Sequence, residues 1–295
     1  MLVDEAVKKH VGMIKQLRGV PGVIPERLAE AFTPRHCALS LVGEPIVYPE
    51  INRFCDLLHE RGISSFLVTN AQFPEQMESL KPITQLYISC DAANKDDLKA
   101  VDRPIFEDFW ERFLTSIDAL SRKQQRTVFR MTLVDQMNMT DVDGYAALIR
   151  RGTPDLVEIK GVTYCGSGNT NPLTMANVPW HHQVVDFSQR IAAAVGNFGG
   201  GIEYGVASEH EHSNCVLLAR RDKFFRDGKW WTWIDFDKFL RLVKAGAPFT
   251  TTDYMLQTPD WAQFGAEERG FDPAEARWRR NQSSVEPVAQ GDGGC

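Results

Sequence analysis

The chain has 295 residues, of which 43% are hydrophobic and 24% charged, and its formal net charge is −6. This composition is typical of an ordinary globular protein, and the length fits one large α/β domain or a barrel. The acidic balance disfavours a partner held by charge alone, and no apolar run matches a membrane span or a signal peptide, so we expect a cytoplasmic protein.

Helices and strands alternate along the first half of the chain. Hydrophobic spacing predicts helices over 3–17, 25–32, 48–61, 75–80, 106–120 and 141–150, and strands over 37–43, 64–69, 85–91, 127–134 and 156–164. Such alternation is typical of a parallel sheet. Because the chain opens on a helix rather than a strand, we expect a partial (β/α) barrel whose first strand is missing.

The second half of the chain has a different character. We predict a helix over 180–195, strand-like runs over 215–219 and 230–234 around the hairpin signal Asp227-Gly228, and a helix over 239–244. From residue 277 onward the sequence is polar and rich in glycine, which is typical of a disordered tail. The predicted parts are therefore a barrel core (1–165), a C-terminal α+β extension (166–275) and a tail (276–295).

Polar side chains stand at or near the end of every predicted strand of the first half. In a parallel sheet these ends share one rim, where α/β enzymes keep their chemistry, although strand ends are also polar because they meet solvent. Within Gly43-Glu44-Pro45, glycine permits a close approach and proline fixes the turn, whereas the carboxylate could receive an ammonium group or begin a helix. The rim residues are Glu44, Thr69, Asn70, Ser89, Asp91, Arg130, Lys160 and Tyr164.

Lys160 lies in the middle of a predicted strand, between Ile159 and Gly161. A lysine at such a position faces a cavity or an acidic partner. Lysines inside barrels form Schiff bases with carbonyl substrates or hold carboxylates. The alternative is a salt bridge, with Glu158 on the same strand face as the candidate partner. We favour the functional interpretation.

Three further patterns have a functional and a structural interpretation. If residues 209–212 form a strand, His210 and His212 share one face and could bind zinc with Cys215, but a hydrogen-bonded histidine pair is the interpretation we favour. The tryptophans of 230–233 could stack nucleobases, or form part of the core or a lid.

Three basic clusters could contact phosphates or simply be solvated surface charge. These clusters are Arg150-Arg151, Arg220-Arg221-Lys223 and Arg277-Arg279-Arg280.

Several segments together resemble one enzyme family, tRNA 4-demethylwyosine synthase, whose members are radical S-adenosylmethionine enzymes. The resemblance runs from about residue 7 to residue 273. The segments that carry it are 37–45 (CALSLVGEP), 66–74 (FLVTNAQFP), 85–92 (QLYISCDA), 125–134 (QRTVFRMTLV), 158–166 (EIKGVTYCG), 209–215 (EHEHSNC) and 231–235 (WTWID).

The resemblance implies a partial (β/α) barrel of the radical S-adenosylmethionine type. It implies that S-adenosylmethionine is cleaved at a [4Fe-4S] cluster, with electrons from a flavodoxin-like domain or a reductase. The radical then starts the condensation of pyruvate-derived carbons with N1-methylguanosine at position 37 of tRNA-Phe. The resemblance thus implies four partners: tRNA-Phe, pyruvate, S-adenosylmethionine and an electron donor.

The resemblance also assigns residues. Gly43, Glu44 and Pro45 match the motif that holds the methionine amino group. Lys160 is our choice for engaging pyruvate, an inference from its position in the strand. The residues at the positions that contact the methionine carboxylate and the ribose are Thr69, Asn70, Ser89 and Arg130.

One departure from the family pattern concerns the cluster. The family holds three irons with C-x-x-x-C-x-x-C and leaves the fourth open, whereas the six cysteines here include no such triplet and no C-x-x-C pair. We therefore expect no metal ligands in this chain. Two accounts follow: the chain is the C-terminal part of a longer enzyme, which we favour, or a cluster-less relative that binds S-adenosylmethionine or tRNA. The runner-up from another class is a barrel lyase that uses Lys160 as a Schiff-base amine.

Overall fold

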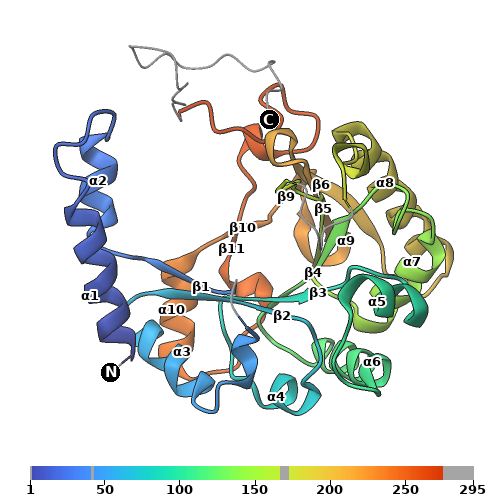
Figure 1. Cartoon of the computed structure of the whole chain (residues 1–295), viewed down its shortest axis with the longest axis horizontal. Helices are drawn as coiled ribbons and strands as arrows, with labels where there is room; N and C mark the ends of the chain where they lie inside the picture. The colour runs from blue at the N-terminus through green and yellow to red at the C-terminus, as the bar shows by residue number, and fades with distance from the viewer. Residues whose placement is uncertain (1, 41–42, 167–172, 275–295) are drawn as a thin grey trace.

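A curved seven-stranded sheet forms the centre of the molecule (Figure 1). The computed structural model describes residues 2–40, 43–166 and 173–274. The sheet order is β1-β2-β3-β4-β5-β7-β6; β1 to β5 pair in parallel, and β7 pairs antiparallel with both β5 and β6. The strands are β1 (His36–Leu39), β2 (Ser64–Thr69), β3 (Gln85–Ser89), β4 (Arg126–Leu133), β5 (Leu156–Gly161), β6 (Tyr204–His210) and β7 (Cys215–Arg220).

Helices lie along the outer face of the sheet and beside its β1 edge, where the first two stand (Figure 1). They are α1 (Leu2–Lys15), α2 (Pro25–Ala31), α3 (Ile51–Glu60), α4 (Pro74–Ser79), α5 (Lys95–Asp102), α6 (Phe109–Leu120), α7 (Val142–Gly152) and α8 (His181–Asn197). Alternate strand residues such as Leu67, Phe129 and Ile159 point outward and are fully buried in this core. No helix in the described ranges is long and apolar enough to cross a membrane.

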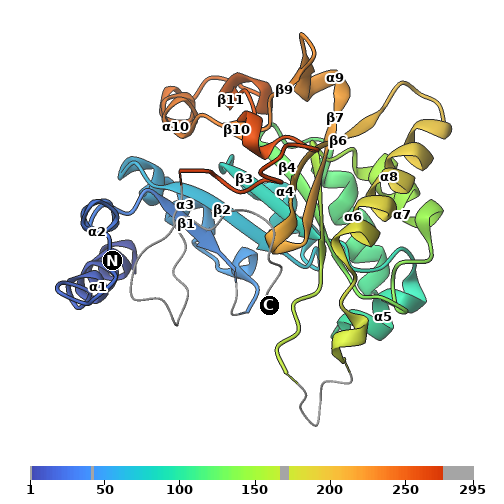
Figure 2. The same cartoon turned by 90° about the horizontal axis from the view of Figure 1, so that it is seen from above.

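The extension after β7 lies over the end of the barrel at which β3 and β4 begin (Figure 2). The Tyr254 hydroxyl accepts from the Arg126 backbone N–H at 2.7 Å and donates to the Thr84 carbonyl at 2.9 Å, which ties the extension to both strands. The elements of the extension are α9 (Arg221–Phe224), β8 (Phe225–Arg226), β9 (Lys229–Trp230), β10 (Trp233–Ile234), α10 (Phe236–Ala245), η4 (Thr251–Tyr254), β11 (Met255–Leu256) and η5 (Asp260–Ala262).

The predicted α/β fold with a partial parallel barrel and a C-terminal extension is confirmed, with local differences. The sequence predicts neither α5 nor β6. The single strand predicted over 230–234 is wrong, because Trp231 and Thr232 separate β9 from β10 and the Thr232 carbonyl accepts from Arg126 instead of pairing. Asp227-Gly228 does form a hairpin turn, but between β8 and β9. The predicted tail lies outside the described residues.

His59 makes the packing beneath the barrel sensitive to acid. Its Nε2 lies 2.7 Å from Ser65 Oγ and its ring packs edge-on against Phe239, and burial lowers its pKa to about 4. As the pH falls below about 6.5, the unfolded state takes up a proton that the folded state resists, so stability decreases. Between pH 7 and pH 4 we expect wild type to lose about 1–3 kcal/mol more than His59→Gln in urea unfolding. His182 is exposed, so the free energy of unfolding of the control variant His182→Gln should change with pH as that of wild type does. The same change of the free energy of unfolding with pH in all three proteins would contradict the role of His59.

Candidate functional site

Glu44 lies at the rim beside the end of β2. Its Oε2 accepts the backbone N–H of Asn70 at 2.9 Å, whereas its Oε1 is buried and has no hydrogen-bond partner among the described residues. Burial raises the pKa of Glu44, opposed by hydrogen bonds that include one from Thr69. Gly43 has a φ of 69°, and Pro45 begins the 3-10 helix η1 (Pro45–Val47), so Glu44 lies in the turn between them. The free oxygen is a hydrogen-bond acceptor held ready for a donor.

A second group lies on the inner face of the sheet and consists of Arg130, Glu158, Lys160 and Cys215, which we call the Lys160 cluster. Lys160 and Cys215 are partners across β5 and β7. Glu158 and Arg130 form an ion pair, with Glu158 Oε1 3.4 Å from Arg130 Nε. The buried Nε makes no hydrogen bond within the described residues. The salt bridge considered for Lys160 is not formed within the described residues, because Glu158 pairs with Arg130 instead. The amine is thus not neutralised by a direct acidic contact.

Burial shifts the pKa values of Glu158 and Cys215, two members of this cluster. It raises the pKa of Glu158, against the opposing effects of Arg130 and Lys160. It also raises the pKa of Cys215 to about 12, so that this thiol stays protonated at neutral pH and is a poor nucleophile. The group with the chemistry of an amine nucleophile is Lys160, with a carboxyl two residues away on the same strand face.

The remaining rim residues divide into two sets. Ser89 lies in register with Arg130 on the neighbouring strand and thus belongs beside the Lys160 cluster. Asp91 serves the backbone instead: its Oδ1 accepts the N–H of Thr132 at 2.7 Å. The Thr69 hydroxyl likewise accepts from the Ala71 N–H at 3.1 Å.

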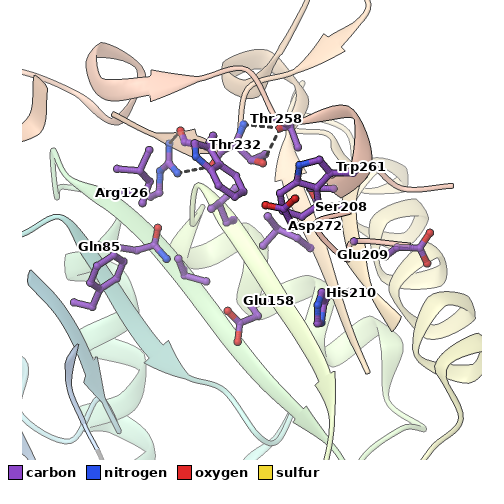
Figure 3. Close-up of a pocket in the computed structure, with 18 of the residues that line it drawn as sticks. Gln85, Arg126, Glu158, Ser208, Glu209, His210, Thr232, Thr258, Trp261 and Asp272 are labelled. Carbon is purple, nitrogen blue, oxygen red and sulfur yellow. Dashed lines mark hydrogen bonds between the residues drawn. The ribbon is translucent and has the colours of Figure 1, made fainter. Parts of the chain in front are cut away.

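The inner face of the sheet and the extension enclose a cavity of about 640 Å³, which we call the lumen cavity (Figure 3). Its size is that of a small-molecule site. From the sequence, Glu158, His210 and Trp233 were considered, each in another role, and no role was assigned to Ser208, Trp261 or Asp272. The lining residues are Phe66, Gln85, Arg126, Val128, Leu156, Glu158, Ser208, Glu209, His210, Leu217, Thr232, Trp233, Ile234, Phe236, Thr258, Trp261, Ala262, Gly270, Phe271 and Asp272.

The histidine pattern of 209–212 does not form one strand face, since β6 ends at His210 and a 3-10 turn, η3 (Glu211–Ser213), follows. The ring centroids of His210 and His212 are 6.2 Å apart. Within the part of the chain that the structure describes, no three His, Cys, Asp or Glu side chains are placed to hold a metal ion. The zinc interpretation therefore has no structural support.

The side chains of the described basic clusters all have partners within the protein. Arg151 pairs with Asp118, Arg220 pairs with Asp222, and Lys223 pairs with the buried Asp155. Arg150 donates to the backbone carbonyls of Val195 and Gly199. Arg221 stacks on the rings of Phe225 and Trp230. Residues 277–280 lie outside the described ranges.

Comparisons with known proteins agree with one another. Residues 151–220 match a family model described as wyosine base formation. The chain is 60% identical over 281 residues to the S-adenosyl-L-methionine-dependent tRNA 4-demethylwyosine synthase of Oryza sativa subsp. japonica, covering 95% of this chain and 42% of that protein. It is 54% identical over 290 residues to the human synthase TYW1, covering 96% and 39%, respectively.

A solved structure of TYW1 with a lysine–pyruvate adduct bound is also similar, with a TM-score of 0.64 and 25% identity, over 74% of this chain and 68% of that one. This likeness supports the fold described above. The chain spans less than half the length of the two curated relatives.

Proposed function

Because this chain is a homologue of the tRNA 4-demethylwyosine synthases over nearly its whole length, we propose that it forms the substrate-binding and S-adenosylmethionine-binding part of such an enzyme. The activity would be the condensation of pyruvate-derived carbons with N1-methylguanosine at position 37 of tRNA-Phe by radical chemistry. An electron donor, either a flavodoxin-like domain or a reductase, would complete the system.

The observation that carries the proposal is the position of Lys160. Its amine lies on the inner face of the sheet, without an acidic partner among the described residues and two residues from Glu158. In our proposal the Lys160 Nζ attacks the C2 carbonyl of pyruvate, and one water leaves as the imine forms. Glu158, whose pKa is raised by burial, exchanges the protons of this step. The lysine–pyruvate adduct named for the similar structure is consistent with this role.

The rim residues fit the methionine end of S-adenosylmethionine. The unpartnered Oε1 of Glu44 suits an ammonium group, and Thr69, Asn70, Ser89 and Arg130 are our candidates for its carboxylate and ribose. Bound S-adenosylmethionine would supply the deoxyadenosyl radical at a [4Fe-4S] cluster. This sequence has no C-x-x-x-C-x-x-C and the described residues hold no metal-binding group, so we assign no cluster ligands in this chain.

Reductive trapping tests the proposed function directly. The chain is incubated with pyruvate and borohydride, and its intact mass is measured, with lactate as the control because it has no keto group. We expect one reduced pyruvate adduct per chain and none with lactate. A chain that captures no pyruvate under these conditions would count against the proposed function.

Glu44→Gln tests the S-adenosylmethionine site without any turnover. The amide presents an N–H₂ and no charge to the ammonium, so we expect binding of S-adenosylmethionine in equilibrium dialysis to weaken by about 10- to 100-fold. The exposed Glu50→Gln serves as the matched control and should bind like wild type. Equal affinity of all three proteins would remove Glu44 from the site.

A further inference from the structure

The lumen cavity has the chemistry of a purine site, and we propose that it binds the base of the nucleoside substrate, N1-methylguanine, through Trp261, Trp233, Asp272 and Ser208. This inference rests on the proposed function and adds the residues that recognise the base. Trp233, Trp261 and Asp272 follow β7 in the chain, whereas Ser208 lies in β6. Figure 3 shows Trp261, Ser208 and Asp272 on the side of the cavity opposite Gln85 and Arg126.

Aromatic rings line two parts of the cavity. Trp233 and Trp261 pack edge to face, with centroids 5.7 Å apart and planes at 84°, and Phe66 and Phe236 form a second pair at 6.2 Å. Trp233 is 43% exposed and Trp261 is half-buried, so neither ring is consumed by the core. Exposed aromatic faces in a concave site are suited to stacking on a flat heterocycle.

The polar groups of the cavity match the edges of a methylated guanine. The carboxylates of Glu158 and Asp272 are acceptors, and N1-methylguanine retains the exocyclic N2 amino group as a donor. Ser208 Oγ is buried and has no hydrogen-bond partner among the described residues, so its hydroxyl is free to donate to O6 or N7. A pyrimidine would offer less stacking area, and a purine without an amino group would lose the hydrogen bond to Asp272.

The wall formed by residues 261–272 is fixed before any ligand arrives. The Phe264 N–H donates to the Ala207 carbonyl at 3.2 Å, and the Gly265 N–H donates to Glu209 Oε1 at 2.8 Å. Glu209 in turn contacts His181 Nε2 of α8 at 2.9 Å. Both hydrogen bonds join the wall to β6. The base would therefore meet a surface that needs little reorganisation.

Gly270 sets the position of the last residues of this wall. Its φ is 87°, and a Cβ built there would stand 1.8 Å from the Glu209 carbonyl oxygen, so only glycine permits this approach. The close contact with β6 carries the following residues, Phe271 and Asp272, into the lining of the cavity.

The lumen cavity is continuous with the Lys160 cluster, because Glu158 belongs to both. A base held between the tryptophans and Asp272 would thus have one edge toward the residue that neighbours Lys160. This arrangement brings the two substrates to be joined into one space, with pyruvate on the β5 side and the base on the side of the extension.

Nucleoside binding to the full chain tests the inference, read as quenching of tryptophan fluorescence and checked by equilibrium dialysis. The probes are N1-methylguanosine and N1-methylinosine, which lacks the exocyclic amino group. We expect Trp261→Ala to weaken binding of N1-methylguanosine by about tenfold or more, because stacking is lost. The control is Trp180→Ala, an exposed tryptophan outside the cavity, which should stay within twofold of wild type.

Asp272→Asn tests the polar contact. The substitution should weaken the binding of N1-methylguanosine by about fivefold or more, because a charge-assisted hydrogen bond to the amino group is removed. The binding of N1-methylinosine, which has no such amino group, should be unchanged. Asp227→Asn, in the exposed β8–β9 turn, is the matched control. Wild-type affinity in both cavity variants, with pyruvate still trapped on the chain, would overturn the base site alone. Failure to bind either nucleoside and failure to trap pyruvate would overturn the site and the proposed function together.

Discussion

We expect Lys160→Arg to abolish the pyruvate adduct that borohydride should trap on the wild-type chain. Arginine keeps the positive charge and much of the length of the side chain, but its guanidinium does not form an imine under these conditions. Because Lys160 has no ion-pair partner among the described residues, the substitution breaks no salt bridge there, and folding should be retained. In the intact-mass spectrum of Lys160→Arg after reduction, the amount of adduct should be no greater than in the control without borohydride. Peptide mapping of the wild-type chain should locate the label at Lys160.

The strongest rival amine is Lys123, whose pKa burial lowers. It donates to the backbone carbonyls of Glu78 and Leu80, on the outer side of the barrel, so Lys123→Arg should keep the full adduct. An adduct that survives in Lys160→Arg and disappears in Lys123→Arg would reassign the nucleophile.

Arg126→Met should destabilise the chain by about 3–5 kcal/mol. Arg126 is 1% exposed, and its Nη1 donates to the Thr232 carbonyl at 2.6 Å and its Nε to Thr251 Oγ1 at 3.3 Å. The guanidinium also lies over the rings of Phe224 and Tyr254. Methionine fills similar volume but leaves a buried carbonyl and a buried hydroxyl unpaired.

Urea unfolding followed by circular dichroism measures the loss. Arg122→Met is the control, since Arg122 is an exposed arginine paired with Glu78, and it should unfold almost like wild type. Because Arg126 also lines the lumen cavity, the less stable variant should bind N1-methylguanosine more weakly as the extension loosens. Equal unfolding midpoints for Arg126→Met and wild type would show that the buried guanidinium contributes nothing net.

The parallel half of the fold could be predicted because its signals are local. The strand over 64–69 was predicted with both ends correct, since a short apolar run is bounded by polar residues and by Gly62. β6 was missed because Tyr204–His210 includes Gly205, Ala207, Ser208 and Glu209, which give little strand signal of their own. Pairing with β7 stabilises this strand. Such tertiary contacts can outweigh the low intrinsic strand propensity of its residues.

The rim of the site could likewise be predicted, and the cavity could not. Glu44 and Asn70 follow β1 and β2, two neighbouring strands that pair in parallel. The alternation of strands and helices predicts such a parallel pair, whose ends lie side by side, so the contact between the two residues follows from it. Trp261 and Asp272 stand in irregular chain with no periodicity. They reach the cavity through contacts such as Gly270 against Glu209, which link segments about 60 residues apart and leave no local pattern.

The Tyr254 hydroxyl joins residues far apart in the chain: Thr84, 170 positions earlier, and Arg126, 128 positions earlier. Ribosomal synthesis delivers β1 to β5 long before Tyr254, so the nascent barrel stays open at one end, with an uncovered arginine, for much of translation. Contacts this distant in sequence slow folding and expose apolar surface while they are unmade. The end of the barrel at which β3 and β4 begin therefore gains its cover only after residue 254 has been synthesised.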